Sequence, residues 1–463
     1  MAAEKRLLLV GFRSPEIESF LDLGADVRVA FVNTDRGRRL PDLPIEMFLH
    51  YRVVRHYEEA YLRKDFPAEL RSEIFQKAFN LYRRHFARVT FSRNLSFRSW
   101  LNMDNLFHIS ANFFFDIIKR QGITTIVFSN FPHQGPYIIL YELAKCLGID
   151  TVLATQSQFR GQIWIARSIE NFGDFKDVQG ADQPIPTPNE PTQPFYMKRR
   201  GKLLRLVSTS ATFLRELVKI VLKTISLQIF INPNSVDRNL SRLVQARDRL
   251  KIGSISTSDI SDVDLSEPYV YFPLHLQPEM TTDTWGFAYA DQLLAIEELA
   301  AALPAGTLIY AKENPIQTKF MREPSFYRRL RAIPNLRYVG EHVPSFELIR
   351  NSLFVATISG TAGYEAALMG KGAIHFGVAW YATLPGVFRW QGAETVAKAM
   401  AVQPDRPALE TAFTKLTSKL YPGVIDPDYG VLIEGFDREA EGRRAVESLL
   451  SVIRDTPTPT PPP

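Results

Sequence analysis

Cysteine is nearly absent from this chain of 463 residues, because Cys146 is the single one. One cysteine excludes an internal disulfide framework and a zinc site built on cysteines, and it suits a reducing cytoplasm. Cys146 lies in the apolar run Leu140-Tyr-Glu-Leu-Ala-Lys-Cys-Leu147, where we expect it to pack in a core. The amino terminus lacks the apolar core of a secretory signal, since Met1-Ala-Ala-Glu-Lys-Arg6 leads directly into a predicted strand. These absences predict a cytoplasmic protein.

Long uncharged apolar runs are also missing. The strongly apolar segment 203–231 carries Arg215, Glu216, Lys219 and Lys223, whereas a membrane-spanning helix needs about twenty largely uncharged residues. We expect a buried or interdomain helix in this segment. The alternative is a helix that lies on the membrane surface.

The net charge is modest, at +5, and the composition is that of an ordinary globular protein long enough for two domains. Basic residues gather in the segments 36–39, 83–93 and 198–205. These either form solvated faces or meet phosphate-bearing ligands or an anionic membrane surface. No nucleic-acid-binding motif accompanies them, so we expect no nucleic acid partner.

Several motifs of well-known chemistry are absent, namely the zincin, P-loop, dinucleotide-binding glycine and Gly-x-Ser-x-Gly patterns. A single Asp-x-Asp, Asp262-Val-Asp264, lies in a polar linker rather than at a strand end beside a diphosphate. The sequence therefore predicts neither a cofactor nor a metal ion.

Predicted strands and helices alternate in two parts of the chain. In the first part, strands are expected at 7–10, 27–32, 125–128 and 151–154, with helices at 15–23 and 137–147 and a mostly helical segment at 45–120. In the second part, strands are expected at 269–272, 308–311, 336–339, 353–358 and 373–376. Such alternation predicts parallel sheets. Two Rossmann-like α/β domains facing a cleft, with additional helices, describe the GT-B fold, which transferases share with epimerases and phosphorylases.

The expected domain boundaries follow from this pattern and from polar linkers. They are an N-terminal Rossmann-like domain with a helical insertion at 1–195, a helical segment and linker at 196–266, a C-terminal Rossmann-like domain at 267–435, and a closing helix with a Pro/Thr tail at 436–463. The tail after residue 455 cannot pack, so we expect it to be disordered.

Polar clusters follow the strands of the second part. The carboxyl ends of parallel strands lie along one edge, and ligands bind in the crevice outside them. The clusters are His275-Leu-Gln-Pro-Glu279, Lys312-Glu-Asn-Pro315, Glu341-His342, Ser359-Gly-Thr-Ala-Gly363 and Gly377-Val-Ala-Trp-Tyr381. We therefore expect them to converge on one site.

The turn Ser359-Gly-Thr-Ala-Gly363 precedes a predicted helix, so its glycines and the helix N-terminus favour phosphate binding. The alternative is a helix cap by Ser359 or Thr361. Glu365 follows Thr361 by four residues and does not fit a capping box, which leaves its carboxylate for ribose hydroxyls.

His275, Gln277 and Glu279 offer a proton carrier and hydrogen-bond acceptors for sugar hydroxyls, although structural hydrogen bonding is an equal alternative. Asp283 is expected to touch the sugar, and Asp291 to cap a helix.

The motifs Phe272-Pro-Leu-His-Leu-Gln-Pro-Glu279, Lys312-Glu-Asn-Pro315, Ser359-Gly-Thr-Ala-Gly-Tyr-Glu365 and His375-Phe-Gly-Val-Ala-Trp-Tyr381 resemble the C-terminal half of bacterial capsule and surface polysaccharide biosynthesis glycosyltransferases, which include Kdo transferases. Phe131-Pro-His-Gln-Gly-Pro136 and Gln156-Ser-Gln158 resemble the acceptor half of the same proteins. The resemblance implies a CMP-linked acidic sugar such as Kdo as donor, a glycan or glycolipid as acceptor, and peripheral association with the inner membrane.

The resemblance also implies three sets of site residues. The catalytic set is His275, Glu279, His133 and Gln134. The substrate-binding set is Gln277, Asp283, Gln156, Gln158, Trp380 and Tyr381. The nucleotide-binding set is Glu313, Asn314, Pro315, Ser359, Gly360, Thr361, Gly363 and Glu365.

Two positions depart from the family pattern, which usually has His at the position of Asn314 and Glu at the position of Gln134. An amide cannot act as a general base, so either another group does this work or activity is impaired. A nucleotide-sugar epimerase and a non-catalytic glycan-binding subunit therefore remain the alternatives to a transferase.

Overall fold

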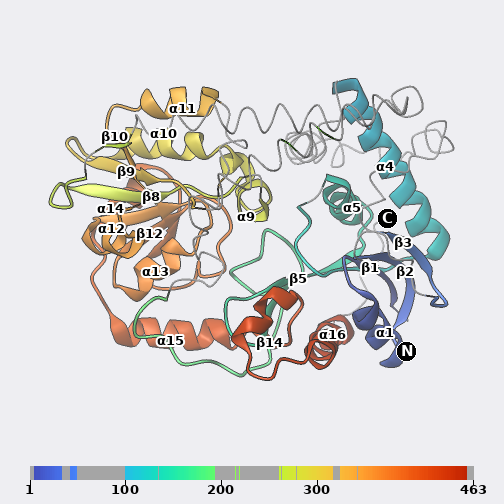
Figure 1. Cartoon of the computed structure of the whole chain (residues 1–463). Coiled ribbons are helices and arrows are strands. Elements are labelled where there is room, and N and C mark those ends of the chain that lie inside the picture. The colour runs from blue at the N-terminus through green and yellow to red at the C-terminus, as the bar shows by residue number, and fades with distance from the viewer. Residues whose placement is uncertain are drawn as a thin grey trace. The chain divides into compact units, whose positions relative to one another are not determined.

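The computed structural model (Figure 1) describes residues 5–33, 42–49, 100–133, 135–192, 214, 218, 260–261, 263–277, 279–315, 317, 324–340 and 342–455. Several expected features lie outside these residues. They are Gln134, Asp262, Glu341, the three basic segments, most of 203–231 and the tail after residue 455. Among the described residues, no helix combines the length and apolar character needed to cross a membrane.

The described residues form two compact units, each built on a seven-stranded sheet. Unit 1 contains those up to Pro186 together with those from Phe413 onward, whereas unit 2 contains those between Thr187 and Ala412. The two ends of the chain therefore contribute to the same unit.

The sheet of unit 1 has the strand order β14-β6-β5-β4-β1-β2-β3. Its strands are β1 (Arg6–Val10), β2 (Asp26–Val32), β3 (Glu46–Leu49), β4 (Thr125–Phe128), β5 (Asp150–Gln156), β6 (Gln162–Ala166) and β14 (Tyr421–Pro422). β1 to β5 pair in parallel, while β6 is antiparallel to both β5 and β14.

The helices of unit 1 form two packed pairs. Their bounds are α1 (Ser14–Asp22), α4 (Trp100–Gln121), α5 (Gly135–Cys146) and α16 (Arg438–Arg454), with a 3-10 turn at Pro427–Leu432. α1 packs on α16, and α4 packs on α5. Phe31 of β2 contacts Phe114 of α4 and Tyr137 of α5, which places this second pair on one face of the sheet.

A half-buried ion pair ties the last helix to the sheet of unit 1. The guanidinium of Arg167, after β6, donates to both carboxylate oxygens of Asp150 at 2.8 Å and to the Val452 carbonyl of α16 at 2.6 Å. Asp150 opens β5, so one side chain joins two strands and a helix that are far apart in sequence.

The sheet of unit 2 is parallel throughout, with the strand order β13-β12-β11-β8-β9-β10-β7. Its strands are β7 (Ile260–Ser261), β8 (Tyr269–Pro273), β9 (Leu308–Lys312), β10 (Leu336–Val339), β11 (Phe354–Thr357), β12 (Gly372–His375) and β13 (Val387–Arg389). From β10 to β13 this is the 3-2-1-4-5-6 order of a Rossmann fold. Two Rossmann-like domains with additional helices are therefore confirmed.

The helices of unit 2 are α9 (Met280–Asp283), α10 (Gln292–Ala302), α11 (Pro324–Arg331), α12 (Ser345–Asn351), α13 (Ala362–Leu368) and α14 (Ala393–Met400), with a 3-10 turn at Phe287–Ala290. The chain returns to unit 1 within α15 (Arg406–Thr417).

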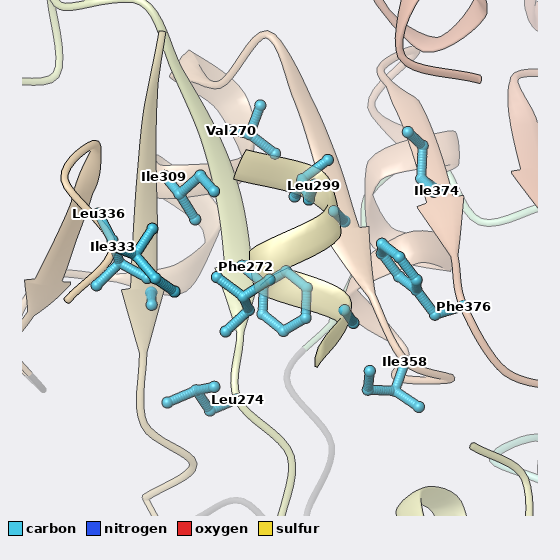
Figure 2. Close-up of a cluster of buried hydrophobic side chains, with 14 of the residues drawn as sticks. Val270, Phe272, Leu274, Leu299, Ile309, Ile333, Leu336, Ile358, Ile374 and Phe376 are labelled. Carbon is cyan, nitrogen blue, oxygen red and sulfur yellow. The ribbon is translucent and has the colours of Figure 1, made fainter. Parts of the chain in front are cut away.

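The core of unit 2 lies where α10, α11 and α14 cover one face of the sheet. Val270 and Phe272 of β8, Ile309 of β9 and Ile374 of β12 form one buried cluster there with Leu299 of α10 (Figure 2). Because side chains alternate along a strand, Tyr269 and Tyr271 point to the other face. There the Tyr269 hydroxyl donates to the Leu348 carbonyl of α12.

Candidate functional site at the carboxyl edge of unit 2

The crossover connections of unit 2 change direction between β8 and β11. In an open parallel sheet this switch point is where a ligand-binding crevice forms. Two of the expected clusters leave the sheet here, at 274–279 after β8 and at 358–363 after β11. The structure therefore brings together the two clusters that are 80 residues apart in sequence, as the prediction of a common edge requires.

Thr357, the last residue of β11, joins these two loops. Its hydroxyl lies 2.8 Å from Nε2 of His275 and accepts a hydrogen bond from the Gly360 backbone N–H at 3.2 Å. Thr357 is fully buried, so its proton needs an acceptor, and His275 Nε2 supplies one. A Cβ at position 360 would come within 2.9 Å of the same nitrogen, so the approach of the loops requires glycine. His275 thus bridges β8 and β11.

The turn of residues 359–363 is fastened on both sides. The Ser359 hydroxyl donates to the Thr281 carbonyl, and the Tyr381 hydroxyl donates to the Gly360 carbonyl. A Cβ at Gly363 would lie 2.4 Å from the Tyr381 hydroxyl oxygen, so glycine is needed for this packing. Neither Ser359 nor the N-cap residue Thr361 caps α13 through its side chain.

Glu365 of α13 is a buried carboxyl group with 8% of its surface exposed. Burial raises its pKa from 4.5 to about 7, against the opposing effect of a hydrogen bond from the Thr361 hydroxyl at 3.3 Å. The group therefore changes charge near neutral pH.

The loop after β8 is built around Asp283. This residue was expected to touch a sugar, but it is fully buried. Its two carboxylate oxygens accept hydrogen bonds from Gln277 Nε2 at 3.2 Å and from the Glu279 backbone N–H at 2.9 Å. Asp283 therefore holds the loop from beneath.

The side chain of Gln277 also forms its hydrogen bonds with other groups of the protein. Its Nε2 also donates to the Ala290 carbonyl at 2.6 Å, and its Oε1 accepts from Gln292 Nε2 at 3.1 Å. Gln292 in turn accepts from the His275 N–H at 2.7 Å, and Gln317 accepts from the Gln277 N–H at 2.8 Å. Sequence reasoning missed Thr357, Gln292 and Gln317, although polar residues beside buried strands were the available signal.

Glu279 differs from its neighbours because it is half-buried and uses one carboxylate oxygen only. Its Oε2 accepts from the backbone N–H of Thr281 at 2.9 Å and from the Thr281 hydroxyl. No hydrogen bond to Oε1 occurs among the residues that the structure describes. The carboxylate is therefore fixed at the N-cap of α9 with a second oxygen that can accept a hydrogen bond.

Two further expected clusters, at 313–315 and at 380–381, accompany the loops 274–279 and 358–363. Glu313, Asn314 and Pro315 are half-buried after β9, the neighbour of β8. Trp380 and Tyr381 are buried, and Trp380 packs against Tyr364 with a ring separation of 4.8 Å. Tyr381 therefore supports the 359–363 turn, and Trp380 packs behind it on α13.

The residues expected on the acceptor side lie in unit 1. His133 is half-buried after β4, and its Nδ1 donates to the Phe131 carbonyl at 2.8 Å. Gln156 is taken up by protein contacts, because its Oε1 accepts from the Ile425 and Asp426 N–H groups and its Nε2 donates to the Gln162 carbonyl. Gln158 is half-buried, and Gln134 lies outside the described residues.

The family comparison concerns the segment that carries the site of unit 2. Residues 254–421 match the capsule polysaccharide biosynthesis protein family. This segment includes every candidate residue from His275 to Tyr381, so the resemblance predicted from the motifs is confirmed there. No curated protein matches the chain.

The solved structures that resemble the chain include proteins with different activities. The beta Kdo 2,7 transferase KpsC of Thermosulfurimonas dismutans is 10% identical, with 79% of this chain and 95% of that chain covered and a TM-score of 0.29. The UDP-GlcNAc 2-epimerase of Methanocaldococcus jannaschii is 11% identical, with 96% and 99% covered and a TM-score of 0.24. The alpha,alpha-trehalose-phosphate synthase (UDP-forming) of Burkholderia vietnamiensis is 11% identical, with 98% and 99% covered and a TM-score of 0.31. At these TM-scores the likenesses carry no functional conclusion.

Proposed function

We propose that the protein is a glycosyltransferase of bacterial surface polysaccharide synthesis that takes a sugar from a nucleotide donor and passes it to a glycan or glycolipid. The observation that carries this proposal is the meeting of the 359–363 turn and the Glu279 carboxylate at the β8/β11 switch point. The segment that contains both matches the capsule polysaccharide family. A phosphate-binding turn near a carboxylate oxygen that can accept a hydrogen bond is what sugar transfer from a nucleotide requires.

Each group would have a separate role. The glycine-containing turn 359–363 would take the donor phosphate against its backbone. Glu313, Asn314 and Pro315 would border the nucleotide, and Glu365 would meet ribose hydroxyls. Glu279 would accept a proton or hydrogen bond through Oε1 on the sugar side. His275, Gln277 and Asp283 would position Glu279 through the contacts described above.

The donor in this proposal is a CMP-linked acidic sugar such as Kdo, used without a metal ion. Calorimetry with CMP, UDP and GDP tests the nucleotide, and we expect CMP to bind most tightly. Tighter binding of UDP or GDP would contradict the CMP assignment alone. Turnover that is unchanged by EDTA is expected.

Glu279→Gln tests the catalytic role. Loss of a general acid or base typically lowers the rate about a hundredfold or more. We therefore expect transfer to fall by that order while calorimetric nucleotide affinity stays near the wild-type value. An equal fall in affinity would assign Glu279 to nucleotide binding. Release of an altered sugar without an acceptor would identify an epimerase, and sugar binding without turnover a glycan-binding subunit.

Peripheral attachment to the inner membrane belongs to the same proposal. Leu214 and Val218 are helical residues four apart, and they expose 61% and 48% of their surface. Residues at this spacing share one helix face, as on a helix that lies on a bilayer. Sedimentation with anionic vesicles, compared between the wild type and Leu214→Gln/Val218→Gln, tests this attachment.

A further inference from the structure

Unit 1 has its own switch point. The order β3-β2-β1-β4-β5 places it between β1 and β4, because α1 follows β1 and α5 follows β4. Backbone hydrogen bonds hold the loops there, from Ser129 N–H to the Val10 carbonyl at 2.9 Å and from Asn33 N–H to the Phe12 carbonyl at 2.8 Å. Residues 11–13 and 129–133 therefore leave the same edge of the sheet side by side.

Arg13 lies on the first of these loops and is half-buried. Three arginines are half-buried among the residues that the structure describes. Arg167 donates to Asp150, and Arg406 donates to Glu410 at 2.7 Å and to the Pro188 carbonyl at 3.0 Å. The guanidinium of Arg13 has no acceptor within the described part of the chain.

The nearest acid to Arg13 in sequence does not neutralise it. Glu16 directs Oε2 to the Arg13 backbone N–H at 2.9 Å, and no ion pair joins the two side chains. A partly desolvated cation gains stability from an anion, and a guanidinium matches the paired oxygens of a carboxylate or phosphate. Arg13 therefore lies on a loop at the switch point of the sheet, with its charge unmatched by the described residues.

We propose that Arg13 binds an anionic group of the acceptor, so that the acceptor is an acidic glycan or a phosphate-bearing glycolipid. That the bound molecule is the sugar acceptor rests on the proposed function, whereas the binding of an anion by Arg13 does not. His133 lies on the adjacent loop. Because its Nδ1–H is donated to the Phe131 carbonyl, Nε2 is the basic nitrogen of the neutral ring. An anionic acceptor held by Arg13 would then lie beside the loop that carries His133.

Binding without turnover tests the anion site directly. Methyl glucuronoside, glucose 6-phosphate and neutral methyl glucoside are titrated by ligand-observed NMR, which separates carboxylate from phosphate recognition. We expect at least one anionic sugar to bind more tightly than methyl glucoside. Arg13→Gln should weaken that binding about tenfold or more, as expected when a charged hydrogen bond is lost, and Arg13→Lys should weaken it less.

Arg6→Gln is the matched control, because Arg6 is an exposed arginine at the opposite end of β1. It should leave anion binding unchanged, and all variants should keep the wild-type nucleotide affinity, which reports that unit 2 is folded. Equal binding of neutral and anionic sugars, binding of none, or unchanged binding by Arg13→Gln would overturn the inference. If the wild type transfers no sugar from any donor, the proposed function fails while this titration still decides the role of Arg13.

Discussion

Glu365 shows how burial alone changes the chemistry of one residue. Its pKa is raised to about 7 because the surrounding protein disfavours the charged form. Below pH 4.5 the carboxyl is protonated in both folded and unfolded chains. As the pH rises from 4.5 to about 7, the unfolded chain ionises first, so stability falls through this window and is constant above it.

We therefore predict that Glu365→Gln removes a pH-dependent loss of stability. The shift corresponds to about 3 kcal/mol, since each pKa unit is worth about 1.4 kcal/mol. Urea denaturation at pH 4.5 and pH 8 measures it. The variant should gain about 2 to 3 kcal/mol on the wild type between the two conditions. Parallel stability curves for the two proteins would show that Glu365 is ionised at its usual pH.

The sequence predicted which polar residues follow the strands, but it did not predict how deeply they are buried. His275, Gln277 and Asp283 follow a strand as expected, yet their polar atoms meet Thr357, Gln292 and the loop backbone. A polar side chain at a strand end serves equally well for a ligand or for a neighbouring loop. Only the partners decide, and these come from residues up to 82 positions away.

At the scale of one element, α13 depends on a glycine that the sequence suggested for another reason. The glycines of the turn were expected to let a phosphate approach. Gly363 also accommodates the Tyr381 side chain, whose hydroxyl and ring would lie 2.4 and 2.7 Å from an added Cβ. The conformation that a ligand would meet is therefore set by the packing behind it.

Gly363→Ala is predicted to destabilise unit 2 by about 1 to 3 kcal/mol, the usual cost of overpacking. Urea denaturation measures this cost. Tyr381→Leu should reduce it in the double variant, because the leucine side chain is shorter and lacks the hydroxyl. An additive double variant would mean that position 363 is strained for a reason other than Tyr381.

The elements that the sequence predicted share a strong local signal. β1, β2, β4, β5 and the five strands from β8 to β12 are apolar runs with short turns, and all are confirmed. β3, β6, β7, β13 and β14 were missed. β14 has two residues and pairs with β6 about 260 positions earlier in the chain, so no local pattern could identify it.

Cys146 was expected to pack in a core but is half-buried, and burial raises the pKa of its thiol to about 11.

At the scale of the whole molecule, unit 1 needs both ends of the chain. α16 buries Val446, Leu449, Leu450, Val452 and Ile453, each with at most 4% of its surface exposed. Burial of one such side chain is worth about 1.5 to 3 kcal/mol, so their sum approaches the full stability of a typical domain.

Truncation after Ala412 is therefore predicted to unfold unit 1 and to leave unit 2 folded. Hydrogen exchange followed by mass spectrometry separates the two. Amides of β1, β4 and β5 should lose protection, while those of β8, β9 and β11 keep it. Truncation after Asp455 is the control, because it removes none of the described contacts. Retained protection in β1 and β4 after the longer truncation would contradict the role given to α16.

Arg167 pairs with Asp150 and donates to the Val452 carbonyl of α16. These contacts can form only after α16 has been synthesised, which affects the order in which the two units fold. A ribosome makes β1 and β5 hundreds of residues before α16, and domains generally fold as units while the chain emerges. Unit 2 is complete once Ala412 has emerged, so the second half of the nascent chain can fold first. The first half must wait for the last helix, and its exposed sheet face is then a natural place for a chaperone to bind.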